Sequence, residues 1–263
     1  MKRIPFLLAA LSLWGCGEQS RTLQTNGSDT LTYSYQDIKE VSALRMNKTD
    51  STYITLHYPL FEGRMADSMN AWVINSLNID MEGGTVYKNA EQLAKAFISG
   101  YDEYAKTDPE YLQSWSAIVS VEVTQNTPLI ISLSSESYAY TGGAHGMSAI
   151  LYSNYDIASQ KLLKLEDLLQ PGYQAPLLQA GERIFRKNEG LKPDETLEGK
   201  YFFEGDTFSL CDNFLITPTS LKFLYNPYEI KPYSEGMTVL EIPYTEISAL
   251  IPKTSLLHTY LKK

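Results

Sequence analysis

A histidine set among glycines is the first candidate for chemistry in this chain. The segment SYAYTGGAHG, residues 137–146, places a histidine behind two glycines whose backbone amides can be exposed. The candidates for an anion or oxyanion site are therefore Tyr140, Gly142, Gly143 and His145. The chain has no Gly-x-Ser-x-Gly nucleophile motif. We therefore favour the alternative, a tight connection between two strands in which His145 hydrogen-bonds to backbone.

A second candidate site is the segment YNPYEIKPYSEG, residues 225–236. Two prolines stiffen it, and its tyrosines and glutamates suit recognition of a basic partner. The candidate binding residues are Tyr225, Asn226, Tyr228, Glu229, Tyr233 and Glu235. The same composition fits a well-packed corner between two strands equally well, so the residues alone leave both interpretations open.

Other chemistries lack the residues that they require. The three histidines, His57, His145 and His258, are far apart and none has a recognised zinc spacing, so we expect no metal site. There is no phosphate-binding loop, dinucleotide fingerprint or EF-hand, so we expect no cofactor and no enzymatic activity. Cys211 has only Cys16 as a possible partner, and we interpret Cys211 as a structural thiol.

The first sixteen residues predict where the protein works. A basic pair precedes an apolar run over 4–14, which is too short to span a membrane and is typical of a secretory signal. The run ends in Leu-Trp-Gly-Cys16, which resembles a bacterial lipobox, so Cys16 would be acylated, with palmitate for example. An ordinary signal peptide cut elsewhere is the alternative. We expect a lipoprotein signal peptide over 1–15, a flexible tether over 16–30, and a lipid-anchored, extracytoplasmic protein of the bacterial cell envelope.

Charge restricts the partners. The formal net charge is −9, and loss of Lys2 and Arg3 with the signal peptide changes it to −11. An acidic chain argues against nucleic acid and predicts that a charged macromolecular partner is basic. The 19 tyrosines, against 9 phenylalanines and 3 tryptophans, fit either an interaction surface or half-exposed strand faces.

Hydrophobic periodicity predicts the elements. Period-two patterns indicate strands over 31–35, 41–44, 53–58, 115–123, 129–140, 148–155, 214–216, 221–225 and 238–242. Helical spacing indicates helices over 65–77, 89–104, 176–190 and 244–251. We expect the strands over 115–123, 129–140 and 148–155 to form an antiparallel meander.

The order of these elements predicts the fold class. Strands and helices come in blocks without β-α-β alternation, which favours an α+β fold of antiparallel sheets with helices packed on one face. We expect two closely packed subdomains. The N-terminal α+β subdomain covers 31–160, the C-terminal α+β subdomain covers 161–252, and a tail follows over 253–263.

Several short motifs together resemble one bacterial extracytoplasmic family. Tyr138-x-Tyr-Thr-Gly-Gly-Ala-His is followed by Asn213-Phe-Leu-Ile, Asn226-Pro-Tyr-Glu-Ile and Ile242-Pro-Tyr. This pattern is similar to the RsiV/PdaC-like family, which contains the outer domain of a lysozyme-sensing anti-sigma factor and the accessory domain of a peptidoglycan deacetylase. The resemblance covers residues 35–252 and implies an N-terminal part packed against a C-terminal part.

Two departures limit what the resemblance implies. The chain has neither the Asp-His-His metal motif of the deacetylases nor a transmembrane helix and sigma-binding segment. The shared extracytoplasmic module binds lysozyme, a strongly basic protein, in the anti-sigma factor. The resemblance therefore predicts a lipid-anchored binding module for lysozyme, another basic envelope-active protein, or peptidoglycan. The alternatives are an envelope polymer hydrolase or esterase that uses His145, and a structural envelope lipoprotein.

Overall fold

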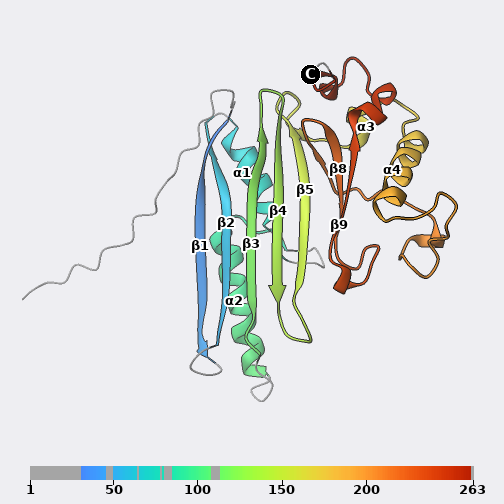
Figure 1. The fold of residues 1–263 in the computed structure, drawn as a ribbon. Helices are drawn as coiled ribbons and strands as arrows, with labels where there is room; N and C mark the ends of the chain where they lie inside the picture. The colour runs from blue at the N-terminus through green and yellow to red at the C-terminus, as the bar shows by residue number, and fades with distance from the viewer. Residues whose placement is uncertain are drawn as a thin grey trace, which may run out of the picture.

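Figure 1 shows the computed structural model, which describes residues 31–45, 50–63, 65–77, 79, 85–107 and 113–261. The predicted signal peptide, the tether and Cys16 lie outside the described residues. The described chain forms two sheets with helices in contact with them, so the predicted α+β class is confirmed. Within these ranges, no helix has the length and apolar character that crossing a membrane requires.

The larger sheet has six strands, which lie side by side in the order of the sequence. They are β1 (Thr32–Arg45), β2 (Ser51–Glu62), β3 (Ser116–Asn126), β4 (Ile130–Tyr140), β5 (Met147–Asp156) and β6 (Lys161–Leu162). β3, β4 and β5 pair antiparallel, which confirms the predicted meander. β2 and β3 instead pair parallel, with Leu56 opposite Val119. A parallel pair needs a crossover, and the two helices between these strands supply it.

Helices α1 (Ala66–Ser76) and α2 (Ala90–Thr107) cover one face of this sheet, as predicted, and lie behind it in Figure 1. The covered face is apolar because strand residues alternate between the two faces, so Ile54, Leu56 and Val119 are buried. The opposite face of the sheet carries no helix among the described residues.

Local sequence explains where two of the helices begin and end. Before α2, Asn89 accepts a hydrogen bond at 2.8 Å from the backbone N–H of Gln92, as an N-cap does. After α4 (Gln174–Asn188), Gly190 has a φ of 67°. The backbone N–H of Leu191 then donates to the carbonyl of Arg186 at 2.8 Å, which satisfies the end of α4 in a Schellman motif.

The smaller sheet is antiparallel and belongs to the C-terminal part. Its strands are β7 (Phe214–Ile216), β8 (Ser220–Tyr225) and β9 (Thr238–Pro243), and the predicted hairpin of the first two is present. The remaining elements are α3 (Leu165–Leu168) and the 3-10 turns η1 (Glu204–Asp206), η2 (Tyr233–Glu235), η3 (Tyr244–Glu246), η4 (Ser248–Leu250) and η5 (Leu256–Thr259). The predicted closing helix is therefore a pair of 3-10 turns.

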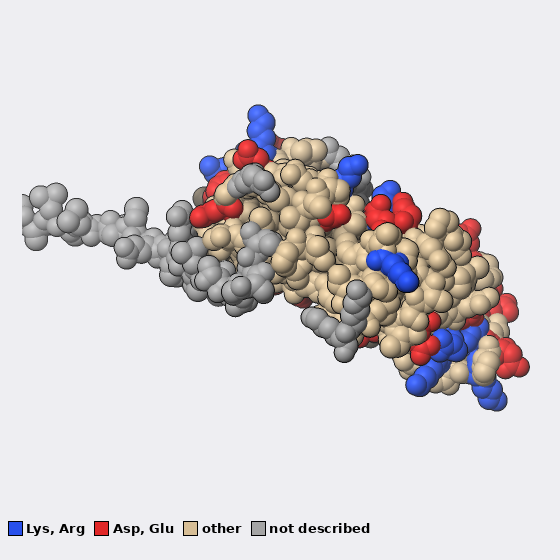
Figure 2. All heavy atoms as spheres, turned by 90° about the horizontal axis from the view of Figure 1, so that it is seen from above, with Lys and Arg blue, Asp and Glu red and all other residues tan. Residues whose placement is uncertain are grey.

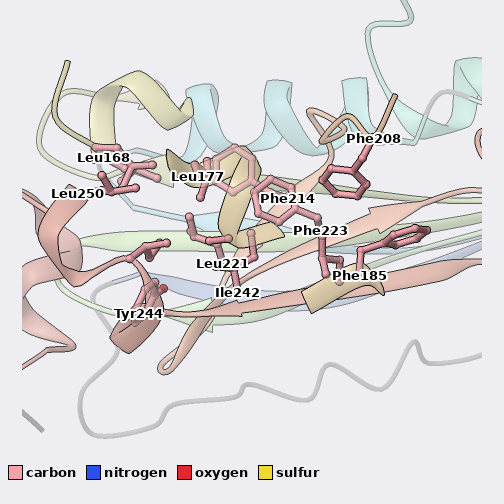
Figure 3. Close-up of a cluster of buried hydrophobic side chains, with 14 of the residues drawn as sticks. Leu168, Leu177, Phe185, Phe208, Phe214, Leu221, Phe223, Ile242, Tyr244 and Leu250 are labelled. Atoms are coloured by element: carbon pink, nitrogen blue, oxygen red, sulfur yellow. The ribbon is translucent and has the colours of Figure 1, made fainter. Parts of the chain in front are cut away.

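A core of large apolar side chains holds the C-terminal part together. Figure 3 shows Phe185 of α4, Phe223 of β8 and Ile242 of β9 in this core. Leu257 is also completely buried in it. The segment predicted as a separate tail over 253–263 thus contributes to the C-terminal core, because its leucines pack inward.

Side-chain amides join the two parts along the outer edge of β5. The backbone N–H of Ile150 donates to Oδ1 of Asn226 at 2.7 Å, and that of Tyr152 donates to Oδ1 of Asn213 at 2.7 Å. The Ile150 carbonyl accepts from Nδ2 of Asn213 at 2.8 Å and from Nδ2 of Asn226 at 3.1 Å. In addition, Nδ2 of Asn154, on β5, donates to the Phe214 carbonyl of the C-terminal part at 2.9 Å. These bonds satisfy an edge that would otherwise need another strand.

Candidate binding site

The two sequence motifs meet where the two parts of the molecule join. The ring of His145, from the β4–β5 loop, stacks on the ring of Tyr233, from the β8–β9 loop, with centroids 4.1 Å apart and planes at 16°. Tyr228 lies beside them, and its ring centroid is 5.7 Å from that of Tyr233. We call His145, Tyr228 and Tyr233 the aromatic triplet. Both loops lie at the lower end of the molecule in Figure 1.

Hydrogen bonds fix the imidazole of His145. Its Nδ1 lies 2.9 Å from the carbonyl oxygen of Gly146, and a carbonyl can only accept, so Nδ1 carries the proton. In the neutral imidazole, Nε2 is then the acceptor, and the Tyr228 hydroxyl, 3.3 Å away, is its donor. The predicted backbone hydrogen bond of His145 is thus present, together with a contact between the loops that the sequence did not indicate.

Two glycines and hydrogen bonds to Gln113 shape the β4–β5 loop. Gly142 and Gly143 have φ values of 113° and 91°, in the region that favours glycine. The Tyr140 hydroxyl lies 2.7 Å from Oε1 of Gln113 and 3.0 Å from the carbonyl oxygen of Gly143. The backbone N–H of Gly143 donates to the same Gln113 oxygen at 3.1 Å. Tyr140 and the two glycines therefore shape the loop that presents His145.

Contacts with the core and with the end of α4 hold the β8–β9 loop in place. Ile230 is buried, and the Lys231 ammonium pairs with the Glu189 carboxylate of the α4 end at 2.6 Å. The backbone N–H of Tyr228 donates to the Lys231 carbonyl at 3.0 Å, and Tyr228 itself has a φ of 71°. A positive φ is uncommon for a non-glycine residue, so the loop holds the Tyr228 ring outward at some conformational cost.

Two of the predicted binding residues are buried. Tyr225 is 2% exposed, and its hydroxyl donates to the Ser209 carbonyl at 2.7 Å; burial raises its pKa above the usual value. Asn226 is 9% exposed, and its amide is bonded to Ile150 of β5. These two residues build the site from beneath, whereas Tyr228 is 48% exposed at its surface.

Two acidic residues of the β8–β9 loop lie close in sequence to the tyrosines of the aromatic triplet. Glu229 follows Tyr228 and Glu235 lies two residues after Tyr233, and we call these two residues the acidic flank. Both are exposed, and one Glu229 oxygen accepts from the Asn226 backbone N–H at 3.0 Å. Figure 2 views the molecule from the end away from these loops. In this view, basic and acidic side chains lie next to one another over the C-terminal part. One ion pair of the C-terminal part joins Arg183 and Glu246 at 2.8 Å.

A cavity adjoins the aromatic triplet. It has a volume of about 430 Å³, opens to solvent, and lies between α2 and the loop end of β4 and β5. Its walls are mainly apolar and include Phe97, Trp115 and Met147, and its lining also includes His145 and Gly142. The sequence indicated Phe97 and Trp115 only as apolar helix and strand residues, and it gave no signal for Gln113.

The site shows no metal-binding arrangement. In the described ranges, no group of three or more His, Cys, Asp and Glu side chains is placed to hold a metal ion. Cys211 is half-buried, with its Sγ 3.3 Å from the Leu224 carbonyl oxygen. Burial raises the pKa of this thiol to about 11, which leaves it protonated and unreactive near neutral pH. Cys211 therefore lies in a structural setting.

Fold and site together define a two-part α+β module with an aromatic surface at its joint. The sequence matches the family model described as "Deacetylase PdaC" over residues 46–148, and the one described as "Protein of unknown function (DUF3298)" over residues 166–245. The chain therefore contains a PdaC-like domain and a DUF3298 domain, which confirms the resemblance found in its motifs. No curated protein matches the sequence significantly.

Solved structures share the fold. A DUF3298 family member from Bacteroides fragilis NCTC 9343 superposes with a TM-score of 0.74 at 18% identity, over 90% of this chain and 99% of that chain. A DUF3298 family protein from Pseudomonas aeruginosa PAO1 gives a TM-score of 0.67 at 19% identity, over 86% of this chain and 96% of that chain. Both likenesses therefore extend over both parts of the molecule. The PdaC-like domain suggests an extracytoplasmic location.

Proposed function

We propose that this protein is a binding module of the bacterial cell envelope that recognises a basic protein, such as lysozyme, through the aromatic triplet. The observation that carries the proposal is the convergence of His145, Tyr228 and Tyr233 from two loops onto one exposed surface. Rigid aromatic side chains provide large contact areas at low entropic cost, which is why tyrosine is common in binding sites.

Charge supports a basic partner. The chain has a formal net charge of −9, and Glu229 and Glu235 belong to the same loop as Tyr228 and Tyr233, while Lys231 of that loop is already paired with Glu189. An acidic flank accelerates the encounter with a cationic protein and repels an anionic one. The adjoining cavity could receive an apolar side chain of the partner, since its walls are mainly apolar.

Anchoring completes the proposal. Acylation of Cys16 would hold the module on the outer side of a membrane, with residues 16–30 as a tether. This position would place the aromatic triplet where envelope-active proteins and peptidoglycan are found. A structural envelope lipoprotein would share the anchor, but it would not need an exposed aromatic surface with an acidic flank.

His145 also allows a test of the rival function, hydrolysis of an envelope polymer. Its Nδ1 is engaged by the Gly146 carbonyl and its Nε2 by the Tyr228 hydroxyl, which favours a positioning role over that of a general base. If the protein were a hydrolase, His145→Ala would abolish hydrolysis of purified peptidoglycan in a variant that is still folded.

Isothermal titration with hen egg-white lysozyme tests the proposal. The full chain should bind lysozyme, and Tyr228→Ala combined with Tyr233→Ala should weaken binding by about tenfold or more, since aromatic anchors often contribute over 2 kcal/mol. α-Lactalbumin, an acidic protein of similar size, serves as the matched negative ligand. Equal affinity for both proteins, or no effect of the two substitutions, would contradict recognition through the aromatic triplet.

A further inference from the structure

The two edges of the six-stranded sheet differ in how they are covered. The edge at β5 is occupied by β6 and by the side chains of Asn213 and Asn226. At the opposite edge, β1 pairs with β2 and with no other strand of the described chain, and it forms the left margin of the sheet in Figure 1. An open strand edge presents backbone N–H and C=O groups that can pair with another strand.

β1 has few of the features that normally block such pairing. Its pairing with β2 is regular from Thr32 to Val41, and a shift in register follows only between Val41 and Arg45. The strand contains no proline. Its centre carries Asp37, Lys39 and Glu40, which are of mixed sign, so these charges oppose some pairings and favour others.

Charge favours one central pairing of β1 with a second β1 over the two adjacent ones. Asp37 and Lys39 are two residues apart on β1, so their side chains point to the same face of the sheet. On that face, Asp37 contacts His57 and Lys39 lies over the Tyr53 ring, both of β2. A two-fold axis at Ile38 would put Asp37 of each copy opposite Lys39 of the other. Moving the axis to residue 37 or 39 would instead oppose two aspartates or two lysines.

The same alignment covers an exposed apolar residue. With the axis at Ile38, Tyr35 of one copy lies opposite Val41 of the other, and Val41 is 43% exposed in the single chain. Aromatic and β-branched residues form favourable cross-strand pairs. Gln36 would lie opposite Glu40, so no like charges face each other between residues 35 and 41.

We propose that β1 is a dimerisation strand, which pairs antiparallel with β1 of a second copy about an axis at Ile38 and continues the sheet across both copies. The interface is isologous, so each copy contributes the same surface. The two Asp37–Lys39 pairs are exposed and add little affinity, but they exclude the neighbouring alignments.

Charge exchange tests this alignment. In sedimentation experiments on the full chain, Asp37→Lys and Lys39→Asp should each weaken self-association by about tenfold or more, because both pairs then carry like charges. The double variant Asp37→Lys/Lys39→Asp should restore it, as should mixing the two single variants. Circular dichroism checks that each variant is folded. Wild-type protein that stays monomeric at 100 μM, or an association that both single variants leave unchanged, would overturn the proposal.

Cysteine cross-linking provides a second measurement. A mixture of Asp37→Cys and Lys39→Cys chains should form a disulfide between copies, because opposite Cα atoms of paired strands lie about 4.5–5.5 Å apart. Either variant alone places its new cysteine opposite a lysine or an aspartate, so it should cross-link no more than wild type, which carries Cys16 and Cys211. Equal cross-linking in the mixture and in the separate samples would overturn the alignment.

Discussion

The imidazole of His145 lies against the ring of Tyr233 at a centroid distance of 4.1 Å, and this contact joins the β4–β5 loop to the β8–β9 loop. One loop belongs to the larger sheet and the other to the smaller sheet. The aromatic triplet therefore exists only when the two parts of the molecule are docked. The asparagine side chains along β5 hold that docking.

Removing one asparagine should destabilise the protein. Asn226→Ala deletes the bonds to the N–H and the carbonyl of Ile150, and it leaves a backbone donor in a partly buried position. We expect a loss of about 2 kcal/mol in the free energy of unfolding, measured by urea denaturation. Asn188→Ala, an exposed asparagine at the end of α4, is the matched control and should change little. Equal stabilities of the two variants would contradict the role of Asn226.

Two glycine-to-alanine changes should have opposite effects. A Cβ atom at Gly146 would lie 2.5 Å from the Tyr138 ring, so Gly146→Ala should cost about 1–3 kcal/mol of stability. At Gly100 in α2, the nearest atom to a Cβ is at 3.9 Å, so alanine fits and should stabilise the helix by up to about 1 kcal/mol. Thermal melts measure both. A Gly146→Ala variant as stable as wild type would show that the Tyr138 ring moves aside without cost.

Alkaline pH should destabilise the protein through Cys211. Burial raises its thiol pKa to about 11 in the folded state, from an ordinary value of 9.0. On raising the pH, the unfolded state therefore loses the thiol proton before the folded state does. The contribution of Cys211 to the free energy of unfolding is complete below pH 9 and is lost as pH rises toward 11. We expect the free energy of unfolding to fall more steeply over this window for wild type than for Cys211→Ala, by about 2 kcal/mol in total. Parallel pH profiles for the two proteins would contradict this account.

Membrane attachment should depend on one cysteine. If Cys16 is acylated, the wild-type protein should partition into the detergent phase, whereas Cys16→Ser should not be lipidated. Cys211→Ser is the control, because it changes the other cysteine of the chain and should leave partitioning unaltered. A mature wild-type N-terminus at any residue other than 16 would contradict lipid anchoring.

Local sequence patterns predicted much of the fold. The β3–β5 meander, the β7–β8 hairpin and the helices on one face followed from the spacing of apolar residues. The parallel pairing of β2 and β3 did not, because periodicity does not distinguish which neighbour a strand chooses. The 3-10 turns at Tyr244–Glu246 and Ser248–Leu250 share apolar spacing with a short helix, which explains why a helix was expected there.

The candidate site was predictable in its parts but not as a whole. Glycine, proline and tyrosine content indicated both loops, yet the contact between Tyr228 and His145 spans 83 positions in the sequence. Such a contact depends on how the two sheets dock. The same limit applies to Tyr225 and Asn226, whose side chains point to the interior and to β5, whereas the loop composition placed them with the exposed residues.

The association rate of the full chain with lysozyme at two salt concentrations tests the central claim most directly. We expect the association rate to fall between 50 and 300 mM NaCl, since the Debye screening length shortens as salt rises and is about 10 Å at 0.1 M. Glu229→Gln/Glu235→Gln should slow association at low salt and flatten the salt dependence. Glu62→Gln/Glu166→Gln, an equal change at exposed residues outside both loops, should not. An association rate that the Glu229 and Glu235 substitutions leave unchanged, or no association at either salt concentration, would contradict recognition of this basic protein at the aromatic triplet.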